Sequence, residues 1–149
     1  MQIETRAFGS VEIDDAQIVT LTRPMPGFAL YRRFALLEPD PECPIKWFQS
    51  VEREDLCFLL VDPQALFPDY RVELGAATLL DLGIGSEGEA AVGVILTVPG
   101  DFHQATANLL APIVFNTARK LARQVILEGS GYPIRAPLFQ EEKRACQAG

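Results

Sequence analysis

Short alternating runs of apolar and polar residues dominate the chain and predict strands rather than helices. Residues 3–13 alternate around Phe8-Gly9-Ser10, which indicates an N-terminal hairpin with a glycine-containing turn. Further runs of strand length, separated by turns rich in proline, glycine or charge, are 18–21, 31–37, 45–51, 56–61, 70–74 and 91–98. About nine short strands predict an all-β, mainly antiparallel fold, a small β-barrel or a sandwich, with one or two short helices.

Two segments have some helical character. Leu74 to Leu82 is rich in alanine and leucine, and Gly83 suits a helix end, so a short helix is expected there, followed by a loop at 85–89. Ala118 to Gln124 also has high helix propensity. The apolar triplet at 125–127 that follows it suits the returning strand of a hairpin, and we favour the hairpin over the helix.

The stretch TANLLAPIVFN, Thr106 to Asn116, places a proline directly before a strand-like run. Pro112 lacks a backbone donor, so the run 113–115 is expected at a sheet edge, or to begin pairing only after the proline. In the first case, residues 108–112 present unpaired backbone to a partner; in the second, the whole segment closes the barrel. Both interpretations place Ile113 and Phe115 on one face of the strand and Val114 on the other.

Length and charge narrow the class of protein. The 149 residues suffice for one domain, which we assign to 1–139, with 140–149 as a polar tail. A formal net charge of -7 repels phosphate, which argues against direct nucleic-acid binding and fits a basic protein partner or a simple contribution to solubility. Neither a secretion signal nor an apolar run of membrane-spanning length is found, so we expect a cytoplasmic protein without membrane attachment.

Candidate catalytic and metal-binding groups are few. The three cysteines, Cys43, Cys57 and Cys146, have no ligand-like spacing, and His103 is the single histidine. We interpret His103 as a loop residue and Asp62, before Pro63, as a turn former. Neither an enzyme nor a cofactor nor a metal site is therefore expected.

Aromatic side chains near turns indicate a protein-binding surface. Trp47 precedes the acidic stretch 52–55, and Phe67 and Tyr70 stand in a proline-flanked segment. Aromatic residues at a rim often dominate protein binding energy. Two alternatives stay open: these rings cap the ends of the β core, or Trp47, Phe67 and Tyr70 line the pocket of a small-ligand-binding β-barrel.

Several segments, in order, resemble the FliW family of flagellar assembly factors. They are Ile3-Glu4-Thr5 with Phe8-Gly9, Pro26-Gly27-Phe28, Trp47-Phe48-Gln49-Ser50, Asp62-Pro63 with Phe67-Pro68-Asp69-Tyr70, Thr106 to Asn116, and Arg123 to Leu127. The match runs from about Ile3 to Phe139. The turn at 117–122 departs from the family pattern, which is usually richer in asparagine and glycine, and so does the polar tail.

The resemblance implies a barrel-like cytoplasmic protein without catalytic activity. Family members bind flagellin before its export, and they bind the translational regulator CsrA, whose basic surface represses flagellin mRNA; the two partners alternate. We therefore expect flagellin and CsrA as partners, a chaperone and regulatory role, no cofactor, and a monomer. The residues nominated for partner binding are Trp47, Phe48, Gln49, Glu52, Glu54, Asp55, Phe67, Tyr70, Asn108, Leu109, Leu110, Pro112 and Asn116.

Overall fold

The computed structural model describes residues 1–85 and 90–138, and strands dominate these ranges. The strands are β1 (Gln2–Thr5), β2 (Gly9–Glu12), β3 (Ile18–Leu21), β4 (Arg33–Leu37), β5 (Ile45–Ser50), β6 (Cys57–Val61), β7 (Ala90–Thr97), β8 (Thr106–Ala107), β9 (Ile113–Asn116), β10 (Leu121–Gln124) and β11 (Ala136–Pro137). The helices are α1 (Pro63–Leu66) and α2 (Ala76–Leu82), with 3₁₀ turns η1 (Asp15–Gln17) and η3 (Phe102–Gln104).

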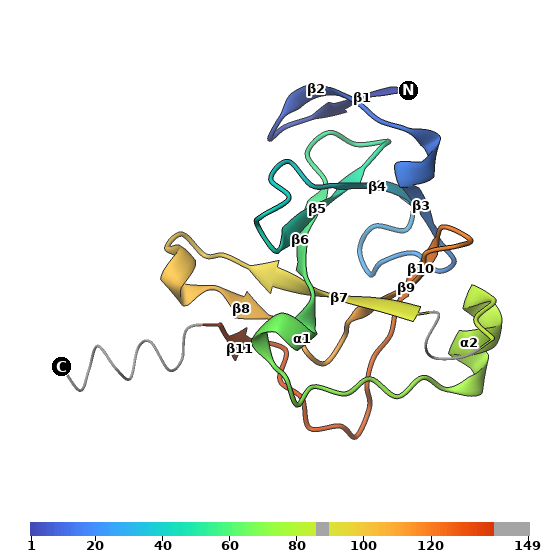
Figure 1. The fold of residues 1–149 in the computed structure, drawn as a ribbon, viewed down its shortest axis with the longest axis vertical. Helices are drawn as coiled ribbons and strands as arrows, with labels where there is room; N and C mark the ends of the chain where they lie inside the picture. The colour runs from blue at the N-terminus through green and yellow to red at the C-terminus, as the bar shows by residue number, and fades with distance from the viewer. Residues whose placement is uncertain (86–89, 139–149) are drawn as a thin grey trace.

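Seven of the strands close into a barrel, which Figure 1 shows nearly end-on. Strands β3, β4, β5, β6 and β7 pair in sequence order; β9 pairs with β7, and β10 pairs with β9 and with β3. The β10–β3 pair is parallel, and the other neighbours are antiparallel. Closure leaves these strands without a free edge. The all-β expectation is confirmed, and the barrel alternative holds.

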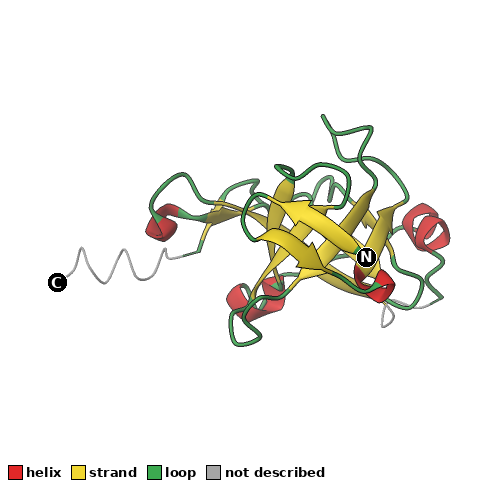
Figure 2. Cartoon of the chain, turned by 90° about the horizontal axis from the view of Figure 1, so that it is seen from above, coloured by secondary structure: helices red, strands yellow, loops and turns green. Residues whose placement is uncertain are grey.

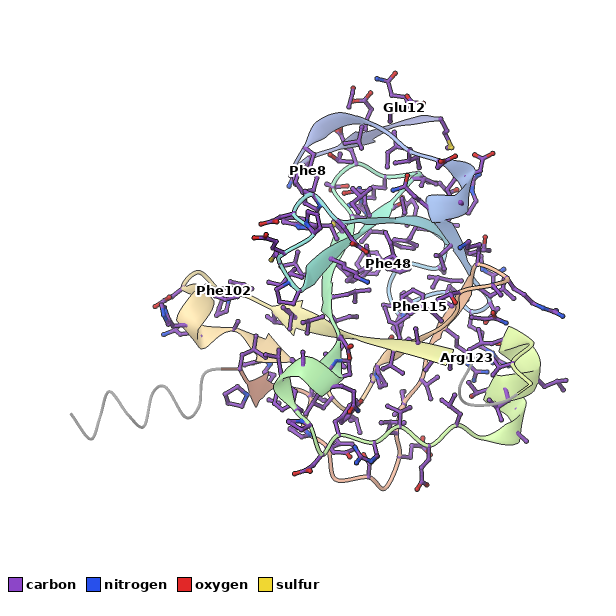
Figure 3. All side chains as sticks on the ribbon, viewed as in Figure 1. Phe8, Glu12, Phe48, Phe102, Phe115 and Arg123 are labelled. Atoms are coloured by element: carbon purple, nitrogen blue, oxygen red, sulfur yellow. The ribbon has the colours of Figure 1, made fainter. Side chains whose placement is uncertain are left out.

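Aromatic rings fill the barrel interior. Phe34 and Phe48 stack with ring centroids 4.6 Å apart, and Phe115 meets Phe48 edge-on at 5.6 Å. Figure 3 labels Phe48 and Phe115 in this region. The β3–β4 loop (residues 22–32) contributes buried Met25 to the same core and therefore covers one end of the barrel. Inward-facing aromatic pairs of this kind add to the stability that buried area gives.

Three smaller apolar clusters cover the outside of the barrel. The β1–β2 hairpin packs Ile3 over β4, and α2 packs Leu82 over β9. On a third side, Tyr70 and Leu109 cover β6 and β7. Figure 2, seen from above, shows helices and loops around the strands. Each strand contributes side chains both to the barrel interior and to the outer clusters, because successive side chains point to opposite faces.

The hairpin favoured at 116–127 is confirmed, although its returning strand begins earlier than expected. The turn is 117–120, and β10 starts at Leu121. Residues 125–127 continue alongside, because the Val125 amide donates to the Pro112 carbonyl and the Leu127 amide to the Leu110 carbonyl. Barrel closure thus overrides the helix propensity of 118–124.

The edge-strand interpretation of TANLLAPIVFN is wrong, and the barrel-closing alternative is right. β9 lies between β7 and β10, and its pairing begins at Ile113, directly after Pro112. The backbone before the proline is also paired: the amide of Asn108 donates to Ile95, and the amide of Leu109 donates to Pro133. As expected, Ile113 and Phe115 face the barrel interior while Val114 packs outside.

Residues 70–74 form no strand, contrary to expectation. Instead, the Tyr70 hydroxyl donates to the Leu109 carbonyl at 2.6 Å and ties this segment to the barrel by its side chain. The helix after it is confirmed as α2, and Gly83 ends it in the left-handed conformation, φ 68°. Most of the loop expected at 85–89 and the tail at 140–149 lie outside the described residues. Within the described ranges, the helices are too short or too polar to cross a membrane.

Candidate protein-binding surface

A buried amide holds the acidic turn, which we define as residues 51–56 between β5 and β6. Gln49 is 1% exposed, and its Nε2 lies 3.1 to 3.2 Å from four backbone carbonyl oxygens. They belong to Ser50, Arg53, Glu54 and Leu56. The amide of one buried side chain therefore holds the backbone of the whole turn.

Further contacts fix the same turn from outside. The Ser50 Oγ accepts hydrogen bonds from the amides of Glu52 and Arg53. The Arg6 amide, just after β1, donates to the Glu54 carbonyl at 3.0 Å. A partner that binds this turn would meet a preorganised backbone and would lose little conformational freedom on binding.

The charges of the acidic turn are partly compensated. Arg53 holds Asp55 through two hydrogen bonds, at 2.6 and 3.2 Å, and these lower the pKa of the Asp55 carboxyl. The Arg33 guanidinium lies 4.0 Å from Glu52. Glu54 has no cation within that distance among the described residues. The turn is therefore less negative than its sequence suggests, and Glu54 supplies its uncompensated charge.

The nominated residues fall into three groups by exposure. Glu52, Glu54 and Asp55 are exposed, and Trp47, Phe67, Asn108 and Leu110 are half-buried. The others, Phe48, Gln49, Tyr70, Leu109, Pro112 and Asn116, are buried. Buried side chains have no surface to offer a partner, so this last group shapes the barrel and its turns. The structure thus exposes the carboxylates of the acidic turn at one place, whereas most of the 109–116 segment is buried.

Phe8 is a surface residue that sequence reasoning missed. Its ring meets Trp47 edge-on, with centroids 4.9 Å apart, and remains 38% exposed. Figure 3 labels it at the tip of the β1–β2 hairpin. The hairpin therefore partly covers Trp47 and places an aromatic ring of its own at the surface. The position of Phe8 in a turn was the available signal, because an aromatic residue in a hairpin turn is rarely there for the turn itself.

The three-aromatic pocket is not formed. A hollow of about 540 Å³ is lined by Tyr70 together with Leu36, Lys46 and Leu60, but neither Trp47 nor Phe67 lines it. Trp47 packs under the β1–β2 hairpin, and Phe67 packs against the Tyr70 cluster. Burial raises the pKa of the Tyr70 hydroxyl, whose proton is engaged with the Leu109 carbonyl. Tyr70 is therefore a structural tie between two segments.

In the described part of the chain, groups that carry acid–base or metal chemistry do not converge. His103 is exposed, with its Nδ1 3.2 Å from the Asp101 carboxylate. Cys57 is half-buried, and burial raises its pKa to about 11, so the thiol stays protonated near neutral pH. Over residues 1–85 and 90–138, no three His, Cys, Asp or Glu side chains gather in a way that could hold a metal ion.

Comparison with known proteins gives the family. The model of the FliW protein family matches residues 2–138. The chain is 38% identical to the flagellar assembly factor FliW of Anoxybacillus flavithermus over 145 residues, which is 97% of this chain and 99% of that protein. It is 41% identical to the Geobacillus kaustophilus protein of the same name over 142 residues, 95% and 98% of the two chains.

A solved structure also matches this chain along most of its length. The crystal structure of the flagellar assembly factor FliW superposes with a TM-score of 0.86 at 39% identity, covering 93% of this chain and 96% of that one. The similarity therefore spans the barrel, the β1–β2 hairpin and the segment from Thr106 to Leu127, which are the parts that carry the motifs. This chain belongs to the FliW family of flagellar assembly factors.

Proposed function

We propose that this protein binds flagellin in the cytoplasm and antagonises CsrA by direct protein–protein binding, which relieves repression of flagellin mRNA. Membership of a family of flagellar assembly factors supports a place in flagellar assembly. The two partners come from the family resemblance, and they act in turn: export of flagellin frees this protein to sequester CsrA. The function is stoichiometric binding without catalysis.

The observation that carries the proposal is the preorganised acidic turn. Its three exposed carboxylates, Glu52, Glu54 and Asp55, stand on a backbone held by buried Gln49. A net charge of -7 adds long-range attraction to a basic RNA-binding protein. Once bound, the same negative charge lies near the path of RNA phosphates and opposes RNA binding.

Calorimetric titration of CsrA tests the CsrA half. The variant carries Glu52→Gln, Glu54→Gln and Asp55→Asn, which removes three negative charges and keeps the side-chain sizes. We expect affinity to fall about tenfold or more at low salt, and by less at moderate salt because ions screen exposed charges. The matched control neutralises three exposed carboxylates elsewhere, Asp69, Glu73 and Glu128, and so has the same net charge.

The titration results distinguish a contact at the acidic turn from a general effect of net charge. If the control binds like the unmodified protein while the turn variant is weakened, the acidic turn is the contact. If both variants lose affinity equally, net charge rather than this turn attracts CsrA. Salt-independent binding that is unchanged in the turn variant would rule out the electrostatic mechanism. A separate titration with flagellin, expected to saturate at a fixed ratio, tests the other partner.

A further inference from the structure

Arginines gather around the C-terminal turn of α2, in a chain that is acidic overall. The Asp81 carboxylate accepts a hydrogen bond from the Thr22 hydroxyl at 2.6 Å and lies 3.4 Å from the Arg123 guanidinium. Arg32 donates to the Thr22 carbonyl at 2.9 Å and so lies at the same place. Segments from the β3–β4 loop, α2 and β10 thus meet here, and Figure 3 shows Arg123 beside α2.

Two more arginines come from the same two segments, the β3–β4 loop and the β9–β10 hairpin. Arg23 follows Thr22 and is exposed. The guanidinium of Arg119 lies against Gly83, where a Cβ would come within 3.0 Å of its Nη1. We call Arg23, Arg32, Arg119 and Arg123 the arginine face. Among residues 1–85 and 90–138, Asp81 pairs with Arg123, and the other three have no carboxylate within 4.0 Å.

An apolar side chain accompanies the charges. Leu80, next to Asp81 on α2, is 84% exposed, the largest exposed fraction among the big apolar side chains of the described residues. Arginine recognises carboxylates through paired hydrogen bonds, and its planar group also packs on apolar surface. Arginines and an exposed leucine at the same end of α2 therefore fit a partner segment with both carboxylates and apolar side chains.

We propose that the arginine face is the docking surface for flagellin, through an acidic, partly apolar segment of that protein. The inference rests on the proposed function and extends it by assigning a site. CsrA, being basic, is repelled by the three arginines that have no carboxylate partner among the described residues and attracted by the acidic turn, so the arginine face is left for the other partner. RNA is a less suitable partner for the arginine face, because the net charge of -7 repels phosphate. A phosphate backbone also offers no apolar group that could pack against Leu80.

The two surfaces adjoin, which explains how the partners could exclude each other. Adjacent residues where the β3–β4 loop meets β4 point to different surfaces: Arg32 of the arginine face donates to the Thr22 carbonyl, while Arg33 pairs with Glu52 of the acidic turn. In the same stretch, the Tyr31 ring lies 5.7 Å from the Arg53 guanidinium. Proteins bound at the two surfaces would meet over the β3–β4 loop. Different contact residues are therefore compatible with alternating partners.

The test is titration of flagellin, CsrA and a flagellin-leader RNA oligonucleotide against the intact protein and three variants. The first variant is Arg23→Glu with Arg32→Glu, and the second is Leu80→Ser. The matched control is Arg71→Glu with Arg135→Glu, which changes the net charge equally. Like Arg32, Arg71 donates side-chain hydrogen bonds to backbone carbonyls. All five positions are exposed, and circular dichroism confirms that each variant is folded.

We expect the Arg23/Arg32 variant to lose about tenfold or more in flagellin affinity and Leu80→Ser to lose about threefold, with CsrA affinity undiminished and the control unchanged. Flagellin binding that is equal in all variants would overturn the site and leave the proposed function intact. Failure of the unmodified protein to bind flagellin would overturn both. RNA binding that the Arg23/Arg32 variant abolishes, with flagellin affinity unaffected, would assign the face to nucleic acid instead.

Discussion

Two turns of the barrel are built by the same device but are attached differently. In the acidic turn, buried Gln49 donates to carbonyls of its own turn. In the β9–β10 turn (117–120), buried Asn116 accepts from the amides of Ala118 and Arg119 and donates to the Leu82 carbonyl of α2. The first turn is self-contained, whereas the second is tied to a helix.

The turns also differ in backbone strain. Lys120 adopts φ 57°, the single positive φ outside glycine among the described residues, while the acidic turn has no positive φ at all. A left-handed non-glycine residue costs about 1 kcal/mol or more, which persists only where the surroundings impose it. In this chain, two features of the surroundings impose the positive φ of Lys120: the closure of the barrel by β9 and β10, and the hydrogen bonds of Asn116. A buried amide beside a turn fixes that turn, so loss of the amide should damage the turn before it damages any partner contact.

The largest effect is expected from Gln49→Glu. A carboxylate there would face four carbonyl oxygens without a donor of its own, at a cost of about 4 kcal/mol. Burial would raise the pKa of the new carboxyl, so the unfolding free energy should fall as pH rises above about 4.3, its unfolded value. Urea denaturation at pH 4 and pH 8 measures this. Gln49→Met serves as the uncharged control; if Gln49→Glu were as stable as that control at both pH values, the carbonyl cage would be refuted.

The next effect is expected from Asn116→Ala. The substitution leaves the Leu82 carbonyl and two turn amides without partners, which should lower the unfolding free energy by about 2 to 3 kcal/mol. Because Asn116 joins two elements, hydrogen exchange should quicken at Gly83 and Ile84 as well as in the turn. Asn116→Asp keeps the acceptor and loses the donor, so exchange in the turn should stay slow while exchange at the end of α2 still quickens. If Asn116→Ala quickened hydrogen exchange in the turn alone, the coupling between the turn and α2 would be contradicted.

Lys120→Gly should act in the opposite direction. Glycine adopts a positive φ without steric cost, so the variant should gain about 0.5 to 1 kcal/mol of unfolding free energy, seen as a higher denaturation midpoint. Lys120→Ala retains a Cβ and should show no such gain. Equal stability of the glycine and alanine variants would mean that the turn is not strained.

Arg53→Ala should have the smallest effect on stability, since the ion pair with Asp55 is exposed and Gln49 and Ser50 hold the backbone. The denaturation midpoint should not move measurably. The pKa of the Asp55 carboxyl, lowered by the Arg53 hydrogen bond, should rise toward its ordinary value, which an NMR titration would detect. A large drop in the midpoint would show that the turn depends on this surface pair.

The strands could be predicted because alternation and turn residues are local signals. The β1–β2 hairpin, β5 and β6 all follow this pattern. The local pattern of residues 70–74 predicts a strand, but what holds this segment is the hydrogen bond from the Tyr70 hydroxyl to the Leu109 carbonyl, a contact between distant segments that a local pattern does not show. The strand start at Leu121 was likewise set by barrel closure rather than by propensity.

The candidate site could be predicted only in part from the sequence. The charges of the acidic turn are contiguous and visible, but the role of Gln49 is not, since a polar side chain that binds its own backbone looks the same in sequence as one that binds a partner. The arginine face draws on residues 23, 32, 119 and 123, which come from two separate segments, the β3–β4 loop and the β9–β10 hairpin. Only the fold brings them together.

The alternation of partners is tested most directly by titrating flagellin into this protein already saturated with CsrA, followed by size-exclusion chromatography. Because the acidic turn and the arginine face adjoin across the β3–β4 loop, flagellin should bind and release CsrA, and a complex of flagellin with this protein alone should elute. A stable complex of all three proteins, or the absence of flagellin binding, would contradict the proposed exchange.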